Sequence, residues 1–236
     1  MKNPKTILWL VVAVCIGCSP GPTQKQITTG ANVADTTILQ QAAENADTIV
    51  PPDYDTTQWT EVSRLLPNAV FDLRYATDNN FVDTVMYDCG RCFLRPEVAL
   101  AIRNIQDELA ERGLGLKFFD CYRPRPIQYK LWEKVPDPRY VADPRKGSMH
   151  NRGAAVDLTI VDADGKELDM GTDFDFFGPR AYHNYTDLPD TVLANRKLLK
   201  ITMENNQFRP TSTEWWHYSY IPKSYPIADM LWKCPL

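Results

Sequence analysis

The chain has 236 residues, of which 44% are hydrophobic and 24% are charged, and this composition suits one globular domain with a substantial core. Lysine and arginine number 26 against 30 aspartates and glutamates, which gives a formal net charge of -4 at pH 7. Because the basic residues form no cluster, the sequence argues against nucleic acid as a partner.

Residues 1–18 are typical of an export signal. Lys2 and Lys5 form a positive start, and the apolar run over residues 7–16 is too short to span a bilayer comfortably. Cys18 directly follows a small residue at the end of this run, an arrangement similar to a bacterial lipoprotein signal. We therefore predict that Cys18 carries a lipid and that the protein is exported to the periplasm, anchored at the outer membrane. An ordinary cleaved signal or an uncut membrane anchor are the alternatives.

The segment between the signal and the domain has a polar composition. Residues 19–57 are rich in Thr, Gln, Ala, Asn and Asp, so they can bury little apolar surface. We expect this segment to be a flexible tether. The main domain is then expected over residues 58–236, with its folded part beginning near Trp59.

Four cysteines remain beyond the signal: Cys89, Cys92, Cys121 and Cys234. An even number of cysteines in an exported protein indicates disulfides, and the sequence does not choose among the three possible pairings. The spacing of Cys89 and Cys92 also fits a redox pair or half of a zinc site, but no second pair with this spacing accompanies it.

Strand and helix signals alternate along the domain. In chain order the expected elements are a strand at 69–75, a helix at 95–112, a strand at 116–122, a helix at 127–134, a strand at 155–160, a helix at 190–205 and a strand at 215–221. The elements in this order do not form regularly repeated βαβ units. It therefore predicts a single α+β domain with a mainly antiparallel central sheet flanked by helices.

Two stretches of the sequence carry candidate metal ligands. His150 and Asp157 are seven residues apart, so they can converge only if the chain turns between them, as Gly153 permits. Glu214 and His217 are three apart and could reach one cavity from the mouth of a strand or from a bulge. Three of these four side chains can hold a zinc ion with one position open for water, and the fourth can take the proton of that water.

Each stretch taken alone also fits a structural role. Asp157 could pair with Arg152, and the later stretch could be an aromatic-rich edge strand with one hydrogen-bonded histidine. If the site exists, Trp215 and Trp216 would flank it and exclude water. The third histidine, His183, is expected at the surface without a role.

The motifs resemble a known family. Ser-x-His-x-x-Gly-x-Ala-x-Asp at 148–157, followed by Glu-Trp-Trp-His at 214–217, is similar to the zinc D,D-peptidases that trim peptidoglycan precursors. The segments Asp-Cys-Tyr-Arg-Pro at 120–124 and Met-Gly-Thr-Asp-Phe-Asp at 170–175 narrow the resemblance to the D-alanyl-D-alanine dipeptidases. The likeness runs over most of the domain and implies the zinc D,D-peptidase (hedgehog/DD-peptidase-like) fold.

The resemblance also implies roles for individual residues. It implies one zinc ion per chain, held by His150, Asp157 and His217, with Glu214 as the catalytic base. It further implies Arg123 near the scissile carbonyl, Asp175 at the free amino group of the substrate, Ser148 near the carboxylate end, and Tyr75 and Tyr87 on the wall of the pocket.

We therefore predict an enzyme that hydrolyses D-alanyl-D-alanine to two D-alanines with water activated on zinc. One alternative is a zinc D,D-carboxypeptidase that acts on longer peptidoglycan peptides, and another is a zinc-containing binding module without turnover. The presence of Glu214 argues against the module, because a purely structural zinc needs no additional base. The expected partners are the small D,D-dipeptide and, through the lipid, a membrane; the sequence does not predict an oligomeric state.

Overall fold

The computed structural model describes residues 51–138 and 140–234, which form one compact unit. The predicted signal and most of the predicted tether lie outside the described residues. Contacts of the folded unit begin before Trp59, because Asp53 forms an ion pair with Arg91 at 2.8 Å. Among the described residues, no helix has the length and apolar character needed to cross a membrane.

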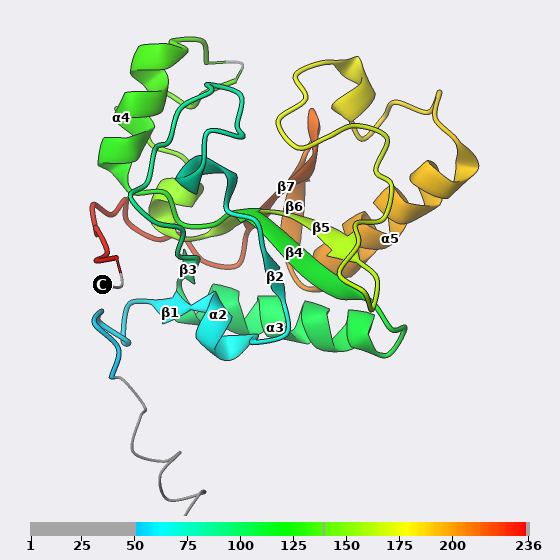
Figure 1. Ribbon diagram of the computed structural model, residues 1–236, viewed down its shortest axis with the longest axis horizontal. Coiled ribbons are helices and arrows are strands. Elements are labelled where there is room, and N and C mark those ends of the chain that lie inside the picture. The colour runs from blue at the N-terminus through cyan, green and yellow to red at the C-terminus, as the bar shows by residue number, and fades with distance from the viewer. Residues whose placement is uncertain (1–50, 139, 235–236) are drawn as a thin grey trace, which may run out of the picture. The chain divides into compact units, whose positions relative to one another are not determined.

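A five-stranded sheet lies at the centre of the domain, with the strand order β2-β4-β5-β7-β6 (Figure 1). The strands are β2 (Val70–Phe71), β4 (Gly115–Asp120), β5 (Ala155–Val161), β6 (Phe208–Thr211) and β7 (Glu214–Tyr220). The pair β2–β4 is parallel, and the other three neighbouring pairs are antiparallel. The prediction of an α+β domain with a mainly antiparallel sheet is confirmed.

Helices flank this sheet. The helices are α2 (Val62–Leu65), α3 (Pro96–Ala110), α4 (Arg125–Lys134) and α5 (Asp190–Asn205). In Figure 1, α3 runs beneath the central strands, and α4 lies on the opposite side of them. One face of α3 carries apolar residues that are buried: Val98, Ile102, Ile105 and Leu109 are each fully shielded from solvent. A separate antiparallel pair joins β1 (Thr60–Glu61) to β3 (Phe93–Leu94).

The first predicted strand is shorter than expected. Only Val70–Phe71 forms a strand, and Arg74–Ala76 forms the 3-10 turn η1. The chain leaves the sheet after Asp72, whose carboxylate accepts a hydrogen bond from Arg74 Nε at 2.8 Å. The turn buries Tyr75, so its apolar ring contributes to the core without belonging to a strand.

The strand β6 was not predicted from the sequence. It contains Pro210, and proline interrupts the pattern of a regular strand. The strand lies at the edge of the sheet, where proline is tolerated because its missing N–H faces no neighbour.

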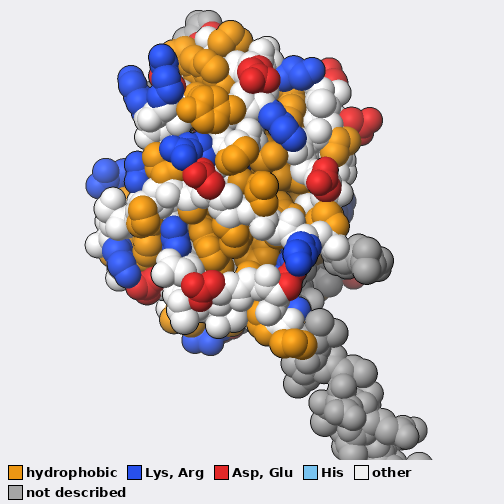
Figure 2. All heavy atoms as spheres, turned by 90° about the vertical axis from the view of Figure 1, so that its left-hand side faces the viewer, with side chains coloured by type: hydrophobic (Ala, Val, Ile, Leu, Met, Phe, Trp, Pro, Cys, Tyr) orange, Lys and Arg blue, Asp and Glu red, His pale blue; other side chains and the backbone are white. Residues whose placement is uncertain are grey.

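Two disulfides join the four cysteines, Cys89 to Cys234 and Cys92 to Cys121. The readings of Cys89 and Cys92 as a redox pair or half of a zinc site are therefore wrong. The bond from Cys89 fastens the C-terminal segment, where Trp232 Nε1 also donates a hydrogen bond to the Cys89 carbonyl at 3.0 Å. Hydrophobic side chains gather on this side of the molecule (Figure 2). Trp232 and Cys234 line a hollow of the folded unit.

Candidate active site

A tight turn brings His150 toward Asp157. The 3-10 turn η2 (His150–Arg152) ends at Gly153, which has φ 66° and therefore lies in the left-handed region. A Cβ atom at this glycine would collide with the ring of Trp59. The chain then enters β5, which carries Asp157. The expected bend at Gly153 is confirmed.

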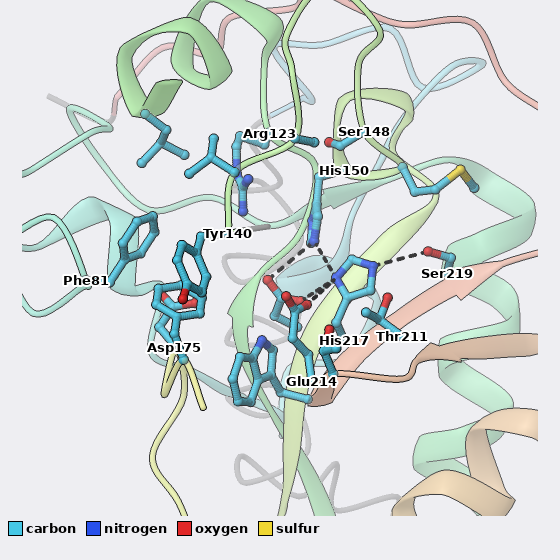
Figure 3. Close-up of a pocket in the computed structure, with 18 of the residues that line it drawn as sticks. Phe81, Arg123, Tyr140, Ser148, His150, Asp175, Thr211, Glu214, His217 and Ser219 are labelled. Carbon is cyan, nitrogen blue, oxygen red and sulfur yellow. Dashed lines mark hydrogen bonds and ion pairs between the residues drawn. The ribbon is translucent and has the colours of Figure 1, made fainter. Parts of the chain in front are cut away.

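Strand pairing places Asp157 and His217 side by side. They are direct partners in the register of β5 and β7, and Asp120 is the partner of Asp157 on β4. His217 Nδ1 lies 2.9 Å from Asp157 Oδ1, and His150 Nε2 lies 3.3 Å from Asp157 Oδ2. In Figure 3 the two imidazoles point toward each other, with 3.1 Å between the two facing nitrogens. The three groups form one cluster.

The outer nitrogen of each imidazole also has a partner. His150 Nδ1 is 2.6 Å from the carbonyl oxygen of Cys121. Because a carbonyl can only accept, Nδ1 carries the proton and Nε2 presents its lone pair to the cluster. His217 Nε2 is 3.2 Å from Ser219 Oγ, which leaves Nδ1 facing Asp157. Both rings are therefore oriented as metal ligands commonly are.

The cluster is chemically suited to a metal ion. One ligand atom from each of His150, Asp157 and His217 lies within 4.8 Å of the others. Burial alone would raise the pKa of Asp157, but the neighbouring imidazoles, His150 foremost, lower it below its ordinary value, so the group is ionised. One carboxylate and two imidazoles are a common ligand set for zinc, and a metal ion would offset the negative charge of this buried carboxylate.

Glu214 lies beside the cluster without being part of it. It is the first residue of β7, and a register irregularity on β6 pairs it with Thr211. Its Oε2 is 4.0 Å from His217 Nδ1, so the two side chains reach the same cavity although they are three residues apart. Burial raises the pKa of Glu214 above its ordinary value, which favours a carboxylate able to accept a proton.

Trp215 and Trp216, which lie between Glu214 and His217 in the sequence, differ in position. Trp216 lines the cavity, as expected. Trp215 does not: it is buried in the core, and its Nε1 donates a hydrogen bond to Thr172 Oγ1 at 2.8 Å. The expectation that both would flank the site is therefore wrong for Trp215. Regular alternation would place Trp215 on the face of His217, but the register irregularity between β6 and β7 interrupts that alternation at the start of β7.

Arg123, three residues after the end of β4, also lines the cavity. It is buried, and Nε and Nη2 donate to Asp120 Oδ2 at 3.0 and 2.6 Å. Nη1 donates to Gln128 Oε1 at 3.0 Å, and the guanidinium lies 4.8 Å from the centre of the Tyr75 ring. This is a fixed, buried cation rather than a surface ion pair.

Asp175 lies on another wall of the cavity. Its backbone has φ 58°, an unusual conformation for a residue other than glycine and one that often marks a functional position. Its Oδ2 accepts a hydrogen bond from the Tyr75 hydroxyl at 3.1 Å. Burial, reinforced by the negative charge of Asp157, raises the pKa of Asp175 well above its ordinary value. A cationic ligand group would offset both effects.

Three other predicted residues can now be placed. Ser148 and Tyr75 line the cavity, and Ser148 Oγ donates to Asn151 Oδ1 at 3.1 Å. Tyr87 does not line it. Its hydroxyl donates to Asp120 Oδ1 at 3.3 Å from behind, and its ring faces the separate hollow beside Trp232. Tyr87 therefore supports the partner of Arg123 instead of forming the pocket wall.

The cavity has a volume of about 430 Å³ and an aromatic rim that the sequence analysis missed. Phe177 contacts Phe81 and Tyr140, with ring centroids 5.0 and 4.6 Å apart. These residues lie on three separate loops, so no periodic pattern marks them. Ser219 was also missed, although it is two residues after His217 and therefore on the same face of β7.

The chain is similar in sequence to a known protein family and to several named proteins. The family described as D-ala-D-ala dipeptidase matches residues 55–231. A protein of Escherichia coli (strain K12) named D-alanyl-D-alanine dipeptidase is 35% identical over 182 residues, covering 76% of this chain and 94% of the relative. A protein of the same name from Enterococcus faecalis (strain ATCC 700802 / V583) is 31% identical, covering 70% of this chain and 92% of the relative.

Two solved structures show a weaker likeness. The LdcB LD-carboxypeptidase is 18% identical with a TM-score of 0.42, over 72% of this chain and 71% of that one. The vancomycin-resistance D,D-dipeptidase VanXYg, solved with a D-Ala-D-Ala phosphinate analogue, is 18% identical with a TM-score of 0.35, over 55% and 51%. The match over residues 55–231, together with relatives above 30% identity, shows that the chain belongs to the D-ala-D-ala dipeptidase family.

Proposed function

We propose that this protein is a zinc-dependent dipeptidase that hydrolyses D-alanyl-D-alanine to two D-alanines. The proposal rests mainly on the cluster of His150, Asp157 and His217. Glu214 lies next to this cluster but is not one of its possible metal ligands. The first three residues would hold one zinc ion. When bound, zinc would polarise the scissile carbonyl and make water more acidic.

The remaining polar side chains have roles that follow from charge. Glu214 takes a proton from the attacking water and later gives it to the leaving amine, and its raised pKa suits both steps. Arg123 donates to the oxygen that becomes negative in the transition state. Because Asp120 and Gln128 already fix the guanidinium, little reorganisation is needed at that moment.

The two ends of the cavity suit a free dipeptide, which carries a positive amine and a negative carboxylate. Asp175 supplies an acid for the amine, and Ser148 supplies a hydroxyl for the carboxylate end. A longer peptide has no free amine at that position, so Asp175 favours the dipeptidase over the alternative of a D,D-carboxypeptidase. The relatives named D-alanyl-D-alanine dipeptidase support the same choice of substrate.

The substitution Glu214→Gln tests the assignment of the base. We expect it to keep one zinc ion per chain and to lower kcat by roughly 10²- to 10⁴-fold, the usual contribution of a general base. The control is Glu204→Gln on the exposed face of α5, which should leave kcat unchanged. Steady-state kinetics and metal analysis of the same samples decide the matter, and full activity of the Glu214 variant would refute the role.

We also propose that the chain is exported and held at the outer membrane, facing the periplasm, by a lipid on Cys18. The two disulfides support an oxidising compartment, since such bonds are rare in the cytosol. Fractionation of cells that express Cys18→Ala tests this: the variant should leave the membrane fraction, and an unchanged membrane association would refute the lipid anchor.

A further inference from the structure

The disulfide between Cys92 and Cys121 lies directly behind the metal cluster. Both residues are buried, with 1% exposure each. Cys121 is the residue whose carbonyl accepts the hydrogen bond from His150 Nδ1, at 2.6 Å. One residue therefore belongs to the disulfide and also orients a proposed metal ligand.

The sheet alone does not fix this carbonyl. The ladder between β4 and β5 has a register irregularity between Phe118 and Asp120, and β4 ends at Asp120. Beyond that point the chain is tied to β3: Tyr122 N–H donates to the Phe93 carbonyl at 2.9 Å, and the disulfide joins Cys121 to the residue before Phe93. Arg123 N–H also donates to the His150 carbonyl at 3.1 Å, so the covalent bond and these two backbone hydrogen bonds together take the place of the regular ladder beside the site.

We propose that the Cys92–Cys121 disulfide is a positioning element of the metal site. It holds the Cys121 carbonyl under His150, which keeps the proton on Nδ1 and the lone pair of Nε2 facing Asp157. The inference rests on the proposed function, because it takes His150 as a metal ligand. The expected consequence is a higher zinc affinity than the same fold would have without this bond.

The second disulfide provides a matched comparison. Cys89 and Cys234 are only half-buried, and their bond fastens the C-terminal segment rather than the cluster. This bond closes a separation of 145 residues, against 29 for Cys92–Cys121. Loop-closure entropy therefore predicts that removing Cys89–Cys234 destabilises the fold more. If the Cys92–Cys121 bond positions the metal site, zinc affinity must follow the opposite order.

The experiment compares Cys92→Ala/Cys121→Ala with Cys89→Ala/Cys234→Ala. Zinc affinity is measured by competition with a chelator, and thermal unfolding of the zinc-free proteins records stability. We expect the first variant to bind zinc about 10- to 100-fold more weakly than wild type, the usual effect of losing a ligand's outer partner. The second should bind as wild type does. Unchanged affinity in the first variant, or an equal loss in both, would overturn the proposal.

A measurement on the wild-type protein decides the matter even if the first variant does not fold. Coupling between two sites is reciprocal, so bound zinc must make the Cys92–Cys121 bond harder to reduce by the factor by which reduction of the bond weakens zinc binding. A factor of 10 to 100 corresponds to roughly 30 to 60 mV for a two-electron couple. The potential of each bond is followed by alkylation and mass spectrometry, with and without zinc, and Cys89–Cys234 should not shift.

The outcomes separate the two proposals. Wild-type protein that takes up no zinc would refute the proposed function. Protein that binds one zinc ion while the potential of the Cys92–Cys121 bond stays unchanged would refute only the positioning role of that bond.

Discussion

Arg123, Asp175 and the two imidazoles are each held by a partner before any substrate arrives. Arg123 rests on Asp120, Asp175 accepts from Tyr75, and His150 donates to a backbone carbonyl. Side chains fixed in this way lose little entropy when they meet a ligand. At the scale of single residues, the cavity is therefore organised for a small ligand with charges at both ends.

The charge of Asp175 should set the preference for a free amine. We expect Asp175→Asn to raise KM for D-alanyl-D-alanine about 10- to 100-fold, since a hydrogen bond to a charged group contributes about 1.5 to 3 kcal/mol. Asparagine keeps the size of the side chain and can still accept from Tyr75. Hydrolysis of the N-acetylated dipeptide, which lacks the positive amine, should change little.

The matched control for this variant is Asp173→Asn. Asp173 is two residues away, and its side chain is 70% exposed. Kinetics with both substrates provide the readout. An equal effect of the two substitutions, or an equal effect of Asp175→Asn on both substrates, would exclude recognition of the amine by Asp175.

His183 gives a prediction about pH. The sequence suggested a surface histidine, but the residue is half-buried; burial, together with the charges of Lys200 and Arg196, lowers its pKa to about 4. The folded protein therefore disfavours the protonated form. Its contribution to stability is complete above the ordinary pKa of 6.5 and is lost as the pH falls toward 4.

Two measurements check the behaviour of His183. An NMR titration should place its midpoint near 4. Urea unfolding at several pH values should show a smaller loss of stability on acidification in His183→Gln than in wild type. A midpoint near 6.5, or an identical pH dependence in the variant, would contradict the account.

At the scale of elements, the site depends on how η2 leads into β5. Gly153 turns the chain between His150 and Asp157, and its positive φ leaves no space for a side chain because Trp59 packs against it. The turn therefore couples two proposed metal ligands to the packing of the core.

Gly153→Ala should damage both the fold and the site. We expect a loss of roughly 2 to 4 kcal/mol in the free energy of unfolding, from left-handed strain and from the clash with Trp59. Zinc affinity should fall as well. The control is Gly113→Ala, which has a similar φ of 69° but open space around the new Cβ. It should lose only about 1 to 2 kcal/mol and no zinc affinity. Equal behaviour of the two variants in chelator competition would refute the coupling.

Periodic elements were predictable from the sequence. The helix near 95–112 and the strand near 155–160 carry regular apolar spacing, and both are present. The helix predicted near 190–205 and the strand predicted near 215–221 are present as well.

Other features depend on contacts that no local pattern reveals. Tyr87 was expected on the pocket wall because only a resemblance placed it there, whereas the path of its loop decides which side its ring faces. The disulfide pairing follows from the approach of β3 to the end of β4, which is a tertiary contact. The rim residue Phe177 lies in a loop, where apolar spacing carries no information.

At the scale of the whole molecule, the cavity draws residues from distant parts of the chain. Tyr75 and Ser219 both line it, although most of the domain separates them in the sequence. A cation held by η2, β5 and β7 would join these elements and stabilise the folded state by mass action. The fold and the metal site are therefore expected to strengthen each other.

Metal analysis tests the central claim most directly. Purified wild-type protein, supplied with zinc and dialysed, should carry one zinc ion per chain and cleave D-alanyl-D-alanine but not L-alanyl-L-alanine. His217→Ala should lose the metal, whereas Glu214→Gln should keep it. Wild-type protein that retains no metal and cleaves neither dipeptide, or a His217 variant that still holds one zinc ion, would contradict the account.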